Sequence, residues 1–223
     1  PMAIWHGSPN FGPRRPGTKV ELVVLHYTAM DSAETALARL CAPEHAVSAH
    51  YLIGAEGTVW QLVRETDRAW HAGAGCWGGA GDVNSRSIGV ELANPGIAPF
   101  AAAQMDALVG LLEGLLARWG LPPRAVIGHE DMAPRRKLDP GPRFDWRRLA
   151  RQGVSVWPQA IAAADPDPAR FSAAMGSFGY PPSADLATFR HRFRPWVGAA
   201  LDGWDVAMAE DLASRLDPIR RNR

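Results

Sequence analysis

The sequence has little cysteine, very little lysine and no long apolar run. Its two cysteines, Cys41 and Cys76, have no second pair with which to complete a cysteine-only metal site or a disulfide framework, so they are predicted to be ordinary thiols. The longest apolar stretch, residues 108–117, contains Glu113 and is far shorter than the roughly 20 residues that span a bilayer. No transmembrane segment is therefore expected.

An excess of charge of one sign is also missing. The 24 basic and 23 acidic side chains leave a formal net charge of +1, which gives no overall field to draw the protein onto nucleic acid or an anionic membrane. We therefore expect the partner to be recognised locally. The protein is also expected to be a monomer. Only Lys19 and Lys137 are lysines, because every other basic side chain is arginine.

A secretory leader is not visible at the start of the chain. The opening residues lack the basic patch, the apolar stretch and the small-residue cleavage site of such a leader. This favours a cytoplasmic protein. A periplasmic or outer-membrane-associated location is the alternative if a leader has been removed.

Three apolar segments have the character of buried strands. Residues 21–25 form a continuous apolar run that ends at His26, and residues 125–128 form a second run that ends at His129. Residues 87–92 form the third. In α/β sheets, ligands collect beyond the strand ends, so both histidines are predicted to lie near a binding site.

A hairpin and a helix are predicted between these strands. Residues 47–53 and 58–63 carry strand-forming residues on either side of a glycine-containing loop, which is typical of a hairpin. Asp31 and Glu34 resemble a capping pair at the start of a helix, and apolar residues then recur at helical spacing through residues 33–41.

Strands that alternate with helices predict an α/β fold. Residues 105–119 carry one apolar stripe of a further helix, which Gly120 closes. After about residue 160 the sequence becomes rich in Ala, Asp and Pro, and short helical pieces follow it. We therefore predict a first domain over residues 1–160, a linker over residues 161–166 and a small helical domain over residues 167–223.

Two imidazoles and one carboxylate are the candidate metal ligands. His26 and His129 follow separate strands, and Asp139 lies in a turn between Leu138 and Pro140. Three protein ligands leave positions free for water and substrate, as in a catalytic zinc site. The same ligand types suit the iron of non-haem oxygenases, which are the main chemical alternative.

Two further residues suggest catalytic chemistry. Glu91 interrupts an apolar strand, and burial of its carboxyl would raise its pKa toward the range of a general base. Lys137 precedes Asp139 by two positions, so its ammonium could stabilise an oxyanion near a metal.

Five segments, taken together, resemble the motifs of a known family. They are residues 25–28 (Leu-His-Tyr-Thr), 47–52 (Val-Ser-Ala-His-Tyr-Leu), 69–73 (Ala-Trp-His-Ala-Gly), 87–92 (Ser-Ile-Gly-Val-Glu-Leu), and 128–130 with 137–141 (Gly-His-Glu and Lys-Leu-Asp-Pro-Gly). In this order they resemble the zinc N-acetylmuramoyl-L-alanine amidases of the peptidoglycan recognition protein superfamily. The resemblance covers about residues 5–150 and is specific, because all five motifs appear in family order.

The resemblance implies a function and a set of roles. It implies a central mixed sheet flanked by helices, and zinc ligands at His26, His129 and Asp139. It also implies that Glu91 is the catalytic base and that Lys137 stabilises the transition state. The expected reaction is cleavage of the amide between N-acetylmuramic acid and L-alanine in peptidoglycan or muropeptides. The alternative is a recognition protein that binds muropeptides without cleaving them.

Substrate contacts are expected around this centre. Tyr27, Trp70, His71 and Asn94 are predicted to line the groove, and Arg136 to hold a peptide carboxylate. The C-terminal helical domain resembles a small three-helix peptidoglycan-binding module, but it departs from that pattern after residue 203.

Overall fold

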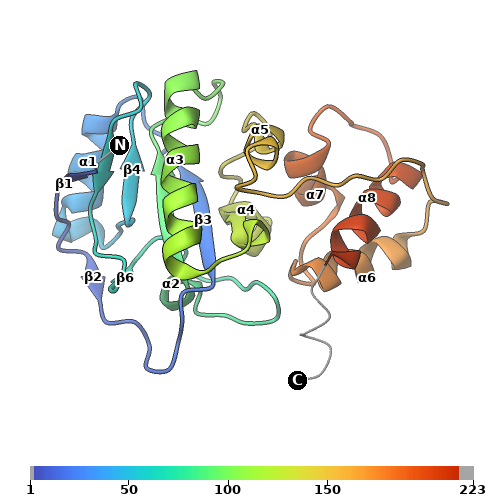
Figure 1. Ribbon diagram of the computed structural model, residues 1–223, viewed down its shortest axis with the longest axis horizontal. Coiled ribbons are helices and arrows are strands. Elements are labelled where there is room, and N and C mark those ends of the chain that lie inside the picture. Colours follow the sequence, from blue (N-terminus) through green and yellow to red (C-terminus); the bar gives the residue numbers. More distant parts are fainter. Residues whose placement is uncertain (1–2, 216–223) are drawn as a thin grey trace.

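The computed structural model describes residues 3–215, and its centre is one mixed sheet (Figure 1). The strands, in chain order, are β1 (Ile4–Trp5), β2 (Phe11–Gly12), β3 (Leu22–Tyr27), β4 (Tyr51–Ile53), β5 (Val59–Gln61), β6 (Arg68–Ala69), β7 (Ser87–Leu92) and β8 (Val126–Gly128). Six of them form the sheet, in the order β1-β5-β4-β7-β3-β8, and β2 pairs separately with β6. The β4–β5 pairing is antiparallel and the other pairings of the large sheet are parallel.

Helices flank this sheet, which confirms the predicted fold class. The α-helices are α1 (Ala33–Cys41), α2 (Val83–Arg86), α3 (Ala102–Trp119), α4 (His129–Met132), α5 (Trp146–Arg151), α6 (Pro168–Phe178), α7 (Leu186–Phe193) and α8 (Gly203–Ser214), with 3₁₀ turns η1 (Pro43–His45) and η2 (Pro123–Ala125). Within residues 3–215, no helix combines the length and the apolar character that crossing a membrane requires.

The alternation of side chains along β3 divides the interior into two cores. Val23 and Leu25 point into the core that contains the apolar stripe of α3. Leu22 and Val24 point to the opposite face of the sheet. His26 continues this second set by the same alternation, so its side chain lies on the face away from α3.

The C-terminal helices cover that second face. The core there includes residues of β3, β8 and α4 together with residues of α6, α7 and α8, among them Leu22, Ile127, Met132, Phe178, Phe189 and Phe193. Figure 1 shows α6, α7 and α8 grouped at one end of the molecule, beside α4 and α5. The C-terminal helices therefore share a hydrophobic core with the sheet.

Two local details differ from the predictions. The hairpin strands are shorter than expected, because β4 and β5 pair through only Tyr51–Ile53 and Val59–Gln61. Helix α1 is capped by Ser32, whose side chain accepts a hydrogen bond from the backbone N–H of Thr35, so the predicted capping role of Asp31 was wrong.

Candidate metal centre

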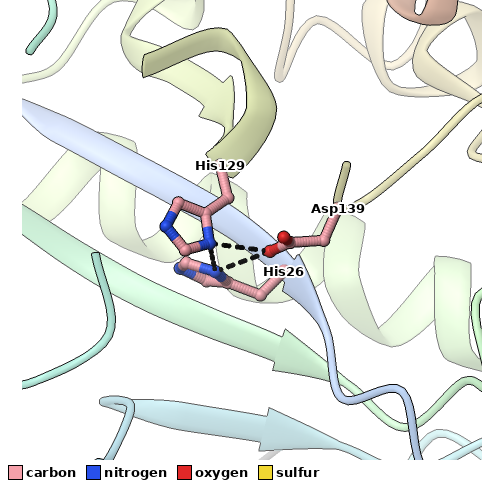
Figure 2. Close-up of side chains that lie close together, drawn as sticks. All are labelled: His26, His129 and Asp139. Carbon is pink, nitrogen blue, oxygen red and sulfur yellow. Dashed lines mark hydrogen bonds and ion pairs between the residues drawn. The ribbon is translucent and has the colours of Figure 1, made fainter. Parts of the chain in front are cut away.

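The three predicted ligands meet at one point on the second face of the sheet. The Nδ1 atoms of His26 and His129 each lie 2.9 Å from Oδ2 of Asp139, and they lie 2.9 Å from each other (Figure 2). All three side chains are buried. His26 comes from the end of β3, His129 from the first position of α4 and Asp139 from the turn beyond it, so the sheet edge gathers residues far apart in sequence.

The outer nitrogen of His129 is bonded to the backbone. Its Nε2 lies 2.8 Å from the carbonyl oxygen of Ala72, which can only accept a hydrogen bond. A proton on Nε2 satisfies this contact, which is shorter than the 3.3 Å approach of Nη2 of Arg136 to the same nitrogen. Nδ1 consequently presents a lone pair toward Asp139 and His26.

A longer chain of hydrogen bonds fixes the ring of His26. The hydroxyl of Ser87 donates to the carbonyl oxygen of Val83 at 2.6 Å, so its oxygen accepts from Nε2 of His71 at 3.2 Å. The Nδ1 atom of His71 is then the acceptor for Nε2 of His26, 3.0 Å away. His26 therefore carries its proton on Nε2 and also turns a free Nδ1 toward the site.

The pKa shifts of His26 and Asp139 agree with this arrangement. Burial, together with the neighbouring His129, lowers the pKa of His26 to about 4, so its ring is neutral at neutral pH. Burial alone would raise the pKa of Asp139, but its close contacts with the imidazoles of His129 and His26 outweigh burial and hold that pKa well below its ordinary value. The cluster offers two imidazole nitrogens and one carboxylate oxygen, which is the donor set of a catalytic zinc site.

Glu91 stands beside this cluster with an unsatisfied carboxyl oxygen. Its Oε2 is buried and has no hydrogen-bond partner within residues 3–215. Burial raises the pKa of Glu91 to about 8, the negative charge of Asp139 adds to the rise, and the positive charge of Lys137 opposes it. A carboxyl with these properties can exchange a proton near neutral pH.

A cavity of about 460 Å³ opens over these groups. His26, Glu91, His129, Lys137 and Asp139 all line it. Four of the five predicted substrate-contacting residues line it as well, namely Tyr27, Trp70, His71 and Arg136.

Several of the predicted groove residues have partners in the protein. His71 holds His26, as described above. Nη2 of Arg136 donates to the carbonyl oxygens of Ala72 and Ala74. The side-chain amide of Asn94 bonds the carbonyl oxygens of Ala98 and Pro99, so Asn94 stabilises a loop and is not among the residues that line this cavity.

Sequence reasoning missed the groups that orient the two histidines. Nothing in the sequence marks the carbonyls of Val83 and Ala72 as partners of a metal ligand. The sequence does offer one sign for Ser87. It lies four residues before Glu91 in the same strand, so the two side chains point to the same face of the sheet.

Residues 16–142 match the family described as N-acetylmuramoyl-L-alanine amidase (Amidase_2). The chain belongs to this amidase family. Over 233 aligned residues it is 36% identical to N-acetylmuramoyl-L-alanine amidase AmiD of Escherichia coli strain K12, covering 88% of this chain and 83% of that protein. It is 43% identical over 104 residues to 1,6-anhydro-N-acetylmuramyl-L-alanine amidase AmpD of Enterobacter cloacae, covering 47% of this chain and 56% of AmpD.

Solved structures of amidases share the fold. The complex of Escherichia coli AmiD with anhydro-N-acetylmuramic acid-L-Ala-D-gamma-Glu-L-Lys superposes with a TM-score of 0.80 at 34% identity, and covers 95% of this chain and 93% of AmiD. AmpDh3 from Pseudomonas aeruginosa in complex with anhydromuramic pentapeptide gives a TM-score of 0.78 at 31% identity, with 94% and 95% covered. Both amidase similarities extend beyond residues 16–142 into the C-terminal helices.

Proposed function

We propose that this protein is a zinc-dependent N-acetylmuramoyl-L-alanine amidase of the peptidoglycan recognition protein superfamily. It hydrolyses the amide between the lactyl group of N-acetylmuramic acid and L-alanine in peptidoglycan or muropeptides. The observation that carries the proposal is the convergence of two Nδ1 atoms and one carboxylate oxygen beside Oε2 of Glu91, which is buried and has no hydrogen-bond partner within residues 3–215. An iron oxygenase would use the same types of metal ligand, but membership of the amidase family favours the zinc amidase.

His26, His129 and Asp139 would hold the zinc ion. When bound, zinc polarises an amide carbonyl and lowers the pKa of water, which is the chemistry such a site supplies. The remaining work falls to side chains of the protein.

Glu91 is the proton carrier in this proposal. Its carboxylate takes a proton from the water that attacks the carbonyl carbon, and it delivers a proton to the alanine nitrogen as the carbon–nitrogen bond breaks. The products are a lactyl carboxylate and a free peptide amine. Lys137 lines the same cavity, and its ammonium stabilises the negative charge that develops on the carbonyl oxygen.

The substrate groove is formed by Tyr27, Trp70 and Arg136 in this account. The aromatic rings of Tyr27 and Trp70 suit contact with the sugar and the alanine methyl group. The guanidinium of Arg136 suits a peptide carboxylate. We propose that residues 1–160 form the catalytic domain, residues 161–166 a linker and residues 167–223 a helical module.

The test is hydrolysis by purified full-length protein supplied with zinc. Anhydro-N-acetylmuramic acid-L-Ala-D-gamma-Glu-L-Lys and intact sacculi are incubated separately, and the products are identified by mass spectrometry. We expect release of the peptide with a free N-terminal alanine. Binding of the muropeptide without cleavage, by protein that carries zinc, would instead identify a recognition protein. Comparison of the two substrates also shows whether the polymer or its soluble fragment is used.

A further inference from the structure

The segment that carries His129 is too short to hold itself in place. Helix α4 spans only His129–Met132, and helices of one turn have little intrinsic stability. Within α4, Oδ2 of Asp131 accepts a hydrogen bond from the backbone N–H of Gly128 at 2.7 Å. Besides the pairing of Gly128 with Leu25 in the sheet, the position of the His129 backbone therefore depends on what holds Asp131.

Asp131 is held by the C-terminal module. Nη1 of Arg192, in α7, lies 2.5 Å from Oδ2 of Asp131, and the hydroxyl of Tyr180 donates to Oδ1 at 2.8 Å. Asp131 and Arg192 are each 3% exposed, and Tyr180 is 4% exposed. Both carboxylate oxygens of Asp131 thus have partners from the module, more than 45 residues away in the chain.

Arg192 also contacts the strand that leads into α4. Its Nη2 donates to the carbonyl oxygen of Val126 at 3.0 Å, at the first residue of β8. Its guanidinium lies 4.1 Å from the ring centre of Trp146 in α5. One side chain of the module therefore bridges the two sides of His129, namely the strand before it and the helix that contains it.

A second contact joins the module to the residue next to His129. Nδ1 of His191 lies 2.9 Å from Oε1 of Glu130. Glu130 and Asp131 directly follow the ligand, and both are paired with α7. The face of α4 that does not bear the metal site is thus attached to the module by polar contacts of defined geometry.

The ion pair between Asp131 and Arg192 is not needed to make the module pack against the sheet. A buried ion pair contributes little net stability compared with apolar residues of similar volume, because both charges lose their hydration. In some proteins such a pair instead fixes the relative position of the two parts that it joins. This agrees with the shared core, in which Ile127 and Met132 pack with residues of α6, α7 and α8.

We propose that Arg192 and Tyr180 are positioning residues for the metal centre, which act through Asp131 to set the place of His129. The module of α6–α8 therefore contributes to zinc binding by holding one of the three ligands in position. The inference rests on the proposed function, since it concerns the affinity of the same three ligands for zinc.

Arg192→Lys tests the inference, with Arg190→Lys as its matched control. Lysine keeps the charge but lacks the planar fork that reaches both Asp131 and the Val126 carbonyl. Arg190 forms a similarly buried pair with Asp205 inside the module, through distances of 3.1 and 2.5 Å, and among residues 3–215 its hydrogen bonds go to residues outside α4. Zinc affinity of each full-length variant is measured by competition with a chromophoric chelator, alongside the melting temperature of the zinc-free protein.

We expect Arg192→Lys to weaken zinc binding by about tenfold, the lower end of the effect of losing a group that hydrogen-bonds a ligand directly, because Arg192 acts through Asp131. Arg190→Lys should stay within about twofold of wild type, whatever its melting temperature. Equal zinc affinity in the two variants would overturn the inference. It would leave the proposed function intact, because wild-type zinc binding and hydrolysis are measured separately.

Tyr180→Phe gives a second reading if Arg192→Lys does not fold. The change removes one hydroxyl and leaves the ring in the core. Its control is Tyr51→Phe, because Tyr51 is also 4% exposed and its hydroxyl donates to a carboxylate, that of Glu65, away from α4. We expect about fivefold weaker zinc binding for Tyr180→Phe and no change for Tyr51→Phe. Unchanged affinity in Tyr180→Phe would contradict the role assigned to Asp131.

Discussion

Glu91 lies directly opposite His26 in the parallel pairing of β7 with β3. Residues in register on adjacent strands point to the same face of a sheet, so the proposed base and the first metal ligand emerge side by side. This relationship needs no loop to maintain it. Catalytic groups built on strands in this way are held in place by the hydrogen bonds of the sheet itself.

The first prediction concerns Glu91 as the base. Glu91→Gln keeps the shape of the side chain but cannot take a proton from water, so turnover of soluble muropeptide should fall by about 10²–10⁴-fold. Zinc content, measured by plasma mass spectrometry, should stay at the wild-type level because the ligands are untouched. A variant that retains zinc and near-normal turnover would remove Glu91 from this role.

The second prediction follows from the pKa of Glu91 in zinc-free protein. Burial raises this pKa from 4.5 to about 8, so between these values the folded protein binds a proton that the unfolded chain releases. The free energy of unfolding must therefore fall as pH rises through this window. Glu91→Gln removes the effect.

Melting temperatures of zinc-free wild type and Glu91→Gln, taken at several values between pH 4.5 and pH 8, provide the measurement. We expect the variant to gain stability relative to wild type as pH rises. A difference between the two that is constant with pH would show that Glu91 does not titrate in this range.

The third prediction concerns Lys137. Lys137→Arg keeps the positive charge but spreads it over a larger planar group, so the charge no longer sits where the carbonyl oxygen becomes negative. We expect kcat to fall by about tenfold or more, with a smaller change in KM. Steady-state kinetics on soluble muropeptide are the check, and rates equal to wild type would exclude a role that depends on the position of the charge.

The fourth prediction concerns the hydrogen-bond chain behind His26. Ser87→Ala removes the acceptor for Nε2 of His71, so His71 is no longer held in the form that accepts the proton of His26. Zinc affinity should weaken by about 10–100-fold. Chelator competition measures it, and Ser85→Ala is a control at a similarly buried serine of α2 whose hydroxyl accepts from Arg15 instead. An unchanged affinity in Ser87→Ala would show that the chain does not orient His26.

Much of the candidate site could be predicted from the sequence because strand ends are easy to recognise. His26 and His129 each follow an apolar run, and the parallel sheet brings such ends to one edge. Glu91 stood out as an ionisable residue within an apolar strand. The ligand types alone suited either zinc or iron. The family motifs implied zinc and assigned a role to each residue.

The parts that could not be predicted depend on contacts between distant segments. Asn94 adjoins a strand end as the ligands do, yet its amide is used by the nearby loop carbonyls of Ala98 and Pro99. The link from Arg192 to Asp131 crosses 61 positions and has no local pattern. Periodicity predicts which face of a helix is buried, but it does not identify the residue on the other side of the interface.

The central claim is that His26, His129 and Asp139 bind one zinc ion. Anomalous diffraction at the zinc absorption edge, from crystals of the full-length protein grown with zinc, tests it most directly. We predict a single strong peak at about 2.0–2.2 Å from Nδ1 of His26, Nδ1 of His129 and a carboxylate oxygen of Asp139. A zinc-loaded protein whose anomalous peak lies on other residues, or crystals with no peak at this cluster, would contradict the account.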